Sequence, residues 1–195
     1  MDVVLASRNT GKLAELSDLL GSVGWRLLPA AGFGGDAPGE PAPTFVENAL
    51  IKARHASRLS KLPAIADDSG IEIDFLGGAP GVGSARYAGD KASDADNNAR
   101  LLEDLRQVPE AQRTARYACV LVFLRSVDDP SPVIAEGYWR GRILEAPRGT
   151  GGFGYDPLFW IEAHGCTSAE LPAALKNRLS HRARAASALL AKLRG

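Results

Sequence analysis

Two long stretches of strand-like sequence, separated by one short turn, constrain the fold of this chain more than any other feature. The first covers residues 113–125 and is apolar throughout 119–124, and the second covers residues 133–145. Residues 128–132 between them read Asp-Asp-Pro-Ser-Pro, which is typical of a turn. Both stretches exceed the usual strand length of about five or six residues. We therefore predict a hairpin in a sheet long enough for two lobes to share.

Strand and helix patterns alternate in the rest of the chain. Before the hairpin we expect a strand at 2–6, a helix at 11–23, a strand at 26–28, a loop at 30–43, a helix opened by Thr44 and ended by Leu62-Pro63, strands at 64–66 and 71–73, an irregular stretch at 76–88 and a helix at 93–106. After it we expect a strand at 158–161, a short helix after Thr167 and a last helix after Ser180. The predicted fold class is α/β: a single domain of residues 1–195 with two lobes and a long central mixed sheet flanked by helices.

Four hydroxyl residues stand where helices are expected to begin: Thr44, Ser93, Thr167 and Ser180. Such side chains accept hydrogen bonds from the first backbone amides of a helix. Three of them are followed, three positions later, by an acidic residue: Glu47, Asp96 and Glu170. For Thr44 this spacing is that of a capping box, so Glu47 has a structural role and needs no other. Lys52, in the same helix, reaches either a phosphate or solvent.

Composition excludes several classes of protein. The chain has 23 basic and 23 acidic residues, so its net charge does not indicate binding to nucleic acid or to a membrane. No apolar run approaches the roughly 20 residues that span a bilayer, and a strand directly after Met1 argues against a signal peptide. Cys119 and Cys166 fit no zinc or redox spacing, and the three histidines are scattered. We expect free thiols in a reducing cytoplasm.

The segment between the first strand and the first helix has the composition of a phosphate-binding turn. It consists of Ser7, Arg8, Asn9, Thr10, Gly11 and Lys12. Backbone amides at a helix N-terminus favour an anion, and Ser7, Asn9 and Lys12 add a hydroxyl, an amide and an ammonium. No glycine stands five residues before Gly11, so this is not a Walker A loop. An ordinary strand-to-helix turn explains the segment equally well.

Two adjacent carboxylates, Asp67 and Asp68, are expected where the strand at 64–66 enters a loop at 67–70. Neighbouring residues of a strand point to opposite faces, so one aspartate can face a cleft while the other braces the loop. Carboxylates suit magnesium, and they can also orient a water molecule or accept its proton. Glu40 is a second candidate ligand. The alternative is a purely structural Asp-Ser-Gly turn.

Residues 149–154 match the pattern G-x-G-x-x-G, but a dinucleotide-binding fingerprint needs a helix immediately afterwards. Pro157 disfavours helical structure in the residue before it, so we reject that interpretation. A tight loop can instead present the Phe153 ring for stacking on a base, a contact worth about 1–3 kcal/mol. Inward packing of Phe153 explains the spacing equally well.

Basic residues gather near the last helix at Lys176, His181 and Arg182. The last two are expected in the first turn, where a positive charge opposes the helix dipole, and such a choice indicates function. Lysine and arginine only donate hydrogen bonds, so they would favour a purine with a 6-oxo group over one with a 6-amino group. The alternative is a solvated basic face.

Taken together, these segments resemble the inosine/xanthosine triphosphate pyrophosphatase family. The matching segments, in the order of the family, are Ser7–Lys12, Thr44–Ala49, Ala66–Gly70, Gly77–Gly81, Gly151–Pro157 and Ser180–Arg182. The resemblance implies a two-lobed α/β fold with the nucleotide in the cleft between lobes, a homodimer, and dependence on magnesium (Mg2+).

The resemblance also implies roles for single residues. Substrate binding is assigned to Ser7, Arg8, Asn9, Thr10, Gly11, Lys12, Ser69, Phe153, Gly154, Tyr155, Asp156, Lys176, His181 and Arg182, with the phosphates on Ser7, Asn9 and Lys12. Asp68 is expected to be the general base and, with Glu40, to hold the metal. Phe153 to Asp156 would line the base pocket, and Lys176, His181 and Arg182 would read the purine.

The activity implied is hydrolysis of non-standard purine nucleoside triphosphates (ITP, dITP and XTP) to the monophosphate and pyrophosphate, cleansing the nucleotide pool of the cytoplasm. Cleavage between the α- and β-phosphates comes from the resemblance alone. The alternative is a purine-nucleotide sensor that does not hydrolyse its ligand, for which a water-activating carboxylate would have no use. A nucleic-acid-binding protein is disfavoured by the balanced charge.

Overall fold

The computed structural model describes residues 1–7, 10–21 and 24–194. Within these ranges it has seven strands: β1 (Asp2–Leu5), β2 (Arg26–Pro29), β3 (Ala64–Ile73), β4 (Thr114–Leu124), β5 (Val133–Ile143), β6 (Phe159–Ile161) and β7 (Cys166–Thr167). They form one sheet in the order β2-β1-β3-β4-β5-β6-β7. Strand β1 runs parallel to β2 and β3, whereas β6 runs antiparallel to β5 and β7. The prediction of a mixed sheet is confirmed.

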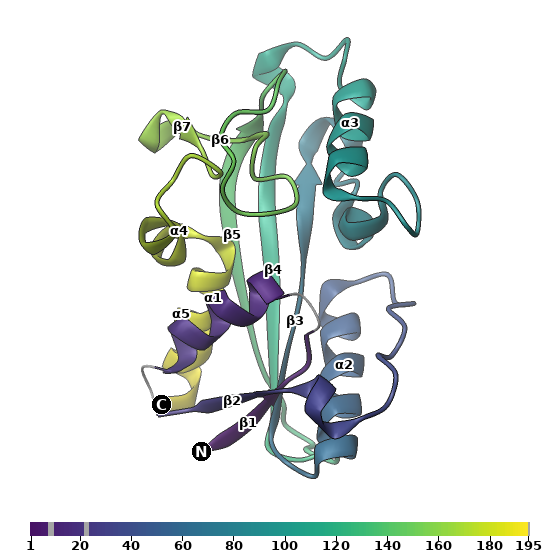
Figure 1. The fold of residues 1–195 in the computed structure, drawn as a ribbon, viewed down its shortest axis with the longest axis vertical. Coiled ribbons are helices and arrows are strands. Elements are labelled where there is room, and N and C mark those ends of the chain that lie inside the picture. Colours follow the sequence, from purple (N-terminus) through teal and green to yellow (C-terminus); the bar gives the residue numbers. More distant parts are fainter. Residues whose placement is uncertain (8–9, 22–23, 195) are drawn as a thin grey trace. The chain divides into compact units, whose positions relative to one another are not determined.

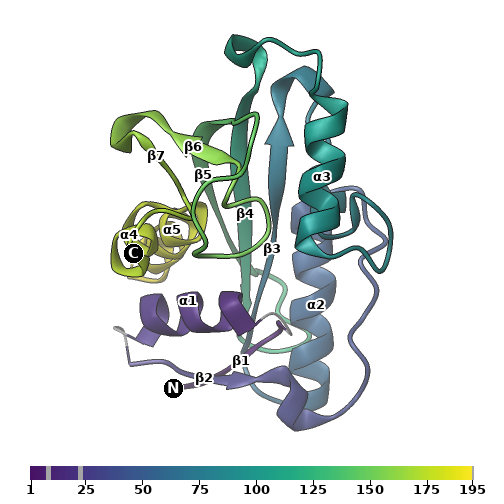
Figure 2. The same cartoon turned by 45° about the horizontal axis from the view of Figure 1, so that its top comes forward.

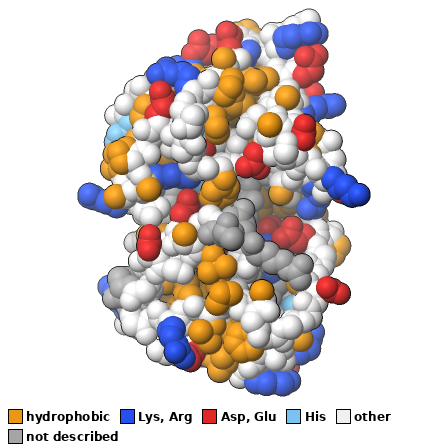
Figure 3. Space-filling view, viewed as in Figure 1, with side chains coloured by type: hydrophobic (Ala, Val, Ile, Leu, Met, Phe, Trp, Pro, Cys, Tyr) orange, Lys and Arg blue, Asp and Glu red, His pale blue; other side chains and the backbone are white. Residues whose placement is uncertain are grey.

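The helices in the described ranges are α1 (Thr10–Gly21), α2 (Phe45–Ser60), α3 (Asp94–Asp104), α4 (Ala173–Leu179) and α5 (His181–Arg194) (Figure 1). Short 3-10 helices lie at Ala30–Phe33, Asp74–Leu76, Gly81–Arg86, Glu110–Gln112 and Glu162–His164. Across this part of the chain, every helix is too short or too polar to cross a membrane. Basic and acidic side chains are interspersed on the face drawn in Figure 3, as the equal numbers of each lead one to expect.

The chain divides into two compact units. The first unit comprises Met1–Asp68, Cys119–Gly137 and Ser180–Gly195, and the second comprises Ser69–Ala118 and Tyr138–Leu179. Strands β3, β4 and β5 each contribute residues to both units.

In the first unit the sheet is covered on both faces. Figures 1 and 2 both show α1 beside α5, with α2 on the opposite side of β1 and β3. Cys119 and Leu121 pack in the cluster that includes α1 and α5, while Val120 and Val122 pack against Ala49 and Ala53 of α2. Because both faces of this part of β4 are buried, residues 119–124 form a continuous apolar run rather than an alternating pattern.

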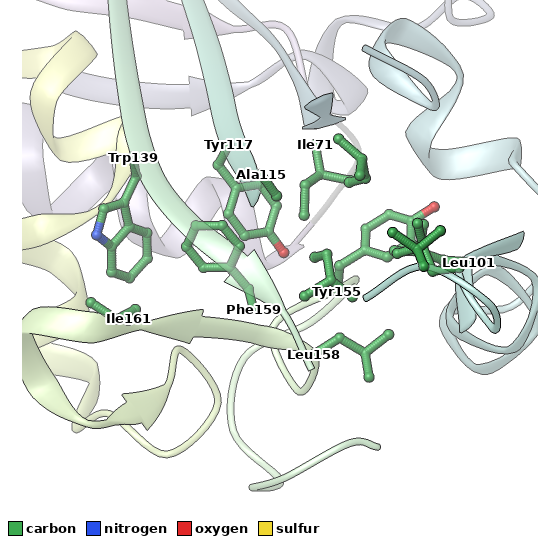
Figure 4. Packing of buried hydrophobic residues seen from close by; sticks show 13 residues of the cluster. Ile71, Leu101, Ala115, Tyr117, Trp139, Tyr155, Leu158, Phe159 and Ile161 are labelled. Atoms are coloured by element: carbon green, nitrogen blue, oxygen red, sulfur yellow. The ribbon is translucent and has the colours of Figure 1, made fainter. Parts of the chain in front are cut away.

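The core of the second unit is built around aromatic rings. The Phe159 ring lies 4.7 Å from that of Tyr117 and 5.4 Å from that of Trp139, centroid to centroid. Figure 4 shows these rings together with Tyr155 and with Leu101 of α3 in one buried cluster. Such tilted aromatic pairs add about 0.5–1.5 kcal/mol beyond the area they bury.

Three of the four expected helix caps are confirmed. The Thr44 hydroxyl accepts from the Glu47 amide, and the Ser180 hydroxyl accepts from the Ala183 amide. At Ser93 both bonds of a capping box form with Asp96. At Thr44 the Glu47 carboxylate accepts a hydrogen bond from the Thr44 hydroxyl, and not from the Thr44 backbone amide as in a capping box.

Two expectations about local structure are wrong. Residues 67–70 are not a loop, because β3 continues through them from Ala64 to Ile73. Thr167 does not cap a helix: it ends β7, and its backbone amide donates to the Glu170 carboxylate at 2.8 Å within a turn. Helix α4 begins later, at Ala173, directly after Pro172. Proline is favoured near the start of a helix because its missing N–H is not needed there.

Gly137 of β5 allows the closest approach of α5 to the sheet. A Cβ atom at Gly137 would lie 2.1 Å from the His181 carbonyl oxygen and 2.4 Å from the Ala185 amide nitrogen. Both are backbone atoms, so the helix would have to move. We predict that Gly137→Ala lowers the free energy of unfolding by about 2 kcal/mol, measured by urea denaturation. The matched control is Gly83→Ala, whose Cβ would meet nothing within 4 Å. Equal stability of the two variants would contradict the packing described.

Candidate active site

Asp67, in the middle of β3, is where three distant segments of the first unit meet. Its carboxylate is 1% exposed. Lys12 of α1 places its Nζ 2.8 Å from Asp67 Oδ2, and Arg182 of α5 places its Nε 3.7 Å from the same oxygen. Arg182 also pairs with Glu15 of α1. Lys12 and Arg182, which are 170 positions apart in the sequence, are thus brought together at Asp67.

Asp68 faces the opposite side of β3, toward α2. Lys52 places its Nζ 2.8 Å from Asp68 Oδ1 and 2.8 Å from Glu40 Oε1. The two aspartates therefore have different partners on different helices, as the alternation of side chains along a strand requires. The Lys52 ammonium is bound between two carboxylates and does not extend into solvent.

The cations set the charge state of Asp67. Burial alone would raise the pKa of this carboxyl group, but the nearby charges of Lys12, Arg182 and Lys52 outweigh burial and hold its pKa well below the ordinary value. Asp67 is therefore a permanent anion at neutral pH, and it fixes the positions of the Lys12 and Arg182 side chains.

Asp68 shows the opposite shift. Burial raises the pKa of its carboxyl group, and the negative charge of Glu40 adds to this, while Lys52 only partly opposes it. Burial lowers the pKa of Lys52, but the negative charges of Asp67, Asp68 and Glu40 outweigh burial and raise the pKa above its ordinary value. The ammonium therefore stays protonated. A carboxylate whose pKa is shifted toward neutrality is the better general base.

Glu40 and Asp68 also have the chemistry of a magnesium site. Both present a carboxylate oxygen to a single cationic group, the Lys52 ammonium, so both are directed at one location. Magnesium is commonly held by one or two carboxylates and completes its shell with water and substrate oxygens. Among the described residues no group of three or more His, Cys, Asp or Glu could hold a metal ion. The donor set fits an ion that shares its coordination with a substrate.

The predicted phosphate segment joins β1 to α1 as expected. Ser7 follows the strand, and α1 begins at Thr10, so Gly11 and Lys12 lie in its first turn. Arg8 and Asn9, two of the predicted substrate-binding residues, lie outside the described residues. Ser69, also predicted to bind substrate, is half-buried in β3 directly after Asp68. Phosphate binding by this segment stays a prediction.

The remaining predicted residues before α5 lie in the second unit, in or near the loop of residues 149–157, here called the Phe153 loop. The Asp156 carboxylate is buried and accepts from the Phe153 amide at 2.9 Å and from the Lys176 Nζ at 2.6 Å. Lys176 Nζ also lies 5.0 Å from the centroid of the Phe153 ring. The Tyr155 hydroxyl donates to the Ser84 carbonyl at 2.8 Å. No helix follows Gly154, in agreement with the rejected dinucleotide motif: β6 begins at Phe159.

The basic residues near the last helix are not a solvated face. Lys176, His181 and Arg182 are all buried. The unfavourable position of Arg182 in the first turn of α5 is compensated by its ion pairs with Glu15 and Asp67.

Asp67 and Lys52 were singled out as candidates in the sequence, whereas Glu15 was not. Asp67, Lys52 and Glu15 organise the charges around Asp68 and Arg182 but were not assigned to the site. Lys52 carries one usable signal: it directly precedes Ala53 of the apolar stripe of α2, so it borders the buried face of that helix. Glu15 carries no such signal, because only its partner Arg182, from a distant segment, shows its role.

The chain matches the model of the Ham1 family over residues 3–192. It is 57% identical over 183 residues to the dITP/XTP pyrophosphatase of Pseudomonas syringae pv. tomato, covering 94% of this chain and 92% of that protein. It is 51% identical over 183 residues to the dITP/XTP pyrophosphatase of Vibrio cholerae, with the same coverage of 94% and 92%.

Solved structures are similar over the same extent. A HAM1 protein from Coxiella burnetii has a TM-score of 0.92 and 44% identity, covering 100% of this chain and 98% of that one. The nucleoside-triphosphatase / dITP/XTP pyrophosphatase from Mycobacterium abscessus has a TM-score of 0.79 and 40% identity, covering 99% and 100%. The similarity therefore includes nearly all of each chain.

Neutralisation of the two aspartates should reduce the free energy of unfolding by very different amounts. Asp67→Asn would leave Lys12 and Arg182 without their shared anion in a buried place, and we expect the free energy of unfolding to fall by about 3 kcal/mol at pH 7. Asp68→Asn removes a negative charge that burial already disfavours, and Lys52 retains its ion pair with Glu40. The free energy of unfolding should therefore fall by no more than about 1 kcal/mol. Urea denaturation measures both. A larger loss for Asp68→Asn than for Asp67→Asn would refute the division of charges.

The thiols should differ in reactivity. Burial raises the pKa of Cys119 to about 12, whereas Cys166 is only half-buried. We expect Cys166→Ser to give no reaction with an aromatic disulfide reagent at pH 8 in the native state, and one thiol per chain after denaturation. Cys119→Ser should react while folded. A native reaction of the Cys166→Ser variant would show that Cys119 is accessible.

Proposed function

The chain belongs to the Ham1 family, and from this we propose that it hydrolyses non-standard purine nucleoside triphosphates, namely ITP, dITP and XTP, to the nucleoside monophosphate and pyrophosphate. Relatives at 51–57% identity bear the name dITP/XTP pyrophosphatase. The observation that carries the proposal is the pair of adjacent carboxylates on β3, each with its own set of cations. In the proposal, Asp67 positions the cations that bind the triphosphate, and Asp68 accepts a proton from water.

In this proposal the phosphates bind at the start of α1. Backbone amides of the first turn and the helix dipole favour an anion there. Lys12, which Asp67 holds in place at 2.8 Å, supplies a positive charge to the triphosphate. Ser7 and Asn9 complete the phosphate contacts. Arg8, Thr10 and Gly11 also bind the substrate, and Ser69 contacts it beside Asp68.

Asp68 is proposed to accept a proton from the attacking water. Its raised pKa, caused chiefly by burial, brings it nearer to neutrality, where proton transfer in the transition state is most effective. Lys52 holds the carboxylate in one orientation through a 2.8 Å contact. Positioning of the water for in-line attack and neutralisation of phosphate charge then account for most of the rate enhancement.

Magnesium (Mg2+) is proposed to be held by Glu40 and Asp68. When bound, such an ion neutralises phosphate charge and lowers the pKa of a coordinated water molecule. Lys52, which contacts both carboxylates, keeps their charges from repelling each other.

Recognition of the base is proposed to involve Phe153 to Asp156 of the Phe153 loop, together with the donors Lys176, His181 and Arg182. Phe153 offers a ring for stacking, and Lys176 lies 5.0 Å from its centroid. A site built from donors favours a 6-oxo purine and leaves donors unpaired against the 6-amino group of ATP, which can give large discrimination. We further propose that the enzyme works as a cytoplasmic homodimer that cleanses the nucleotide pool.

The decisive experiment is a steady-state panel of ITP, XTP, dITP, GTP and ATP, with and without magnesium, in which pyrophosphate and orthophosphate are measured separately. We expect pyrophosphate from ITP, dITP and XTP, little product from ATP, and none without the metal. Release of orthophosphate alone would contradict cleavage between the α- and β-phosphates. Binding without any product would favour a sensor.

Neutralising Asp68 should separate catalysis from binding. We expect Asp68→Asn to lower kcat by about 10³-fold, because the proton acceptor is lost. The affinity for ITP without magnesium, measured calorimetrically, should change little. The matched control is Asp36→Asn, an exposed carboxylate in the same loop as Glu40. Full activity of Asp68→Asn would exclude it as the base.

A further inference from the structure

Helix α3 holds the backbone of the Phe153 loop at a single residue. The amide of Gly154 donates to Asp94 Oδ2 at 2.6 Å, and its carbonyl accepts from Asn98 Nδ2 at 3.0 Å. Both backbone polar groups of Gly154 are thus bound by side chains of one helix. All of these residues lie within the second unit.

The sequence of α3 places these two side chains together. Asp94 is the first residue of the helix and Asn98 lies four positions later, so the two project from the same face. The first turn of α3 is already capped by Ser93 and Asp96, which exchange both hydrogen bonds of a capping box. The carboxylate of Asp94 is therefore available to the loop, and an anion accepting from an amide makes one of the stronger hydrogen bonds in proteins.

The loop needs such restraints because of its glycines. Gly152 and Gly154 have φ angles of +74° and +62°, a conformation that favours glycine. Glycine has the most conformational freedom to lose on ordering, so a loop of this kind samples other conformations unless it is held. Asp156 holds the amide of Phe153 on one side, and α3 holds the next residue, Gly154, on the other. The backbone is thus restrained at Phe153 and at the residue that follows it.

We propose that Asp94 and Asn98 are positioning residues that pre-organise the Phe153 loop for the purine base. This inference rests on the proposed function, in which the loop binds the base. Neither residue is assigned a contact with substrate. Their effect is to reduce the entropy that the loop loses when the base binds, so they affect recognition of the base and not the hydrolytic step.

The inference has a specific kinetic signature. Loosening the loop should raise KM for ITP while leaving kcat nearly unchanged. Inorganic tripolyphosphate has no base, so its inhibition constant should not change. A general loss of structure would weaken both ligands alike, and this difference separates positioning from mere stability.

The experiment compares Asp94→Ala, Asn98→Ala, the double variant and Asp94→Asn with a control, Asp96→Asn. The control weakens the capping box of α3 without removing a contact to Gly154. For Asp94→Ala we expect KM for ITP to rise about tenfold, the loss of one charge-assisted hydrogen bond. The double variant should exceed the product of the single effects, because one remaining clamp still holds the loop. Asp94→Asn keeps an acceptor and should recover part of the loss.

Hydrogen exchange gives a readout that does not depend on activity. Amides of residues 149–157 should exchange about tenfold faster in Asp94→Ala than in Asp96→Asn. Unchanged exchange in Asp94→Ala, or equal weakening of ITP and tripolyphosphate, would overturn the inference. Failure of the wild-type protein to release pyrophosphate from any purine triphosphate would instead overturn the proposed function, and the exchange result would then still decide whether α3 orders the loop.

Discussion

The burial of two adjacent carboxylates in the middle of β3 is the constraint on which the first unit depends. A buried charge without a partner is strongly destabilising, so each aspartate requires cations on its own side of the strand. Lys12 and Arg182 meet Asp67, and Lys52 meets Asp68. Helices α1 and α5 on one face and α2 on the other therefore supply the cations that the two aspartates need, in addition to covering apolar surface.

This arrangement gives neighbouring groups of the same chemistry different tasks. The pKa of Asp67 is lowered because its cations outweigh burial, whereas the pKa of Asp68 is raised because burial and Glu40 outweigh Lys52. When their environments shift the pKa values of two carboxyl groups in opposite directions, one group can remain an anion while the other is suited to accept a proton. The same ion pairs hold the side chains of Lys12 and Lys52 in place, so in the proposed function little ordering of Lys12 remains when the substrate binds.

Much of the fold was predictable because local signals agreed with it. The apolar periodicity gave the long strands and most helices, and Ser93 and Ser180 marked helix starts that the structure confirms. The prediction of a loop at residues 67–70 failed because Asp, Ser and Gly favour turns locally. The ion pairs that Asp67 and Asp68 make within the strand involve residues far away in the sequence. Glu15 was missed for the same reason, since its partner Arg182 comes from the last helix. A sequence read along its length shows candidate charges but not which of them will meet.

The discontinuous make-up of the first unit has a consequence for biosynthesis. Its sheet and two of its helices are made of residues 1–68 and 119–137, but α5, which supplies Arg182 and packs against Gly137, belongs to the last segment of the chain. During synthesis, the ion pair between Asp67 and Arg182 therefore cannot form until the residues of α5 have left the ribosomal exit tunnel. All segments of the second unit, by contrast, precede α5 and are synthesised by Leu179, before the first unit has its last helix.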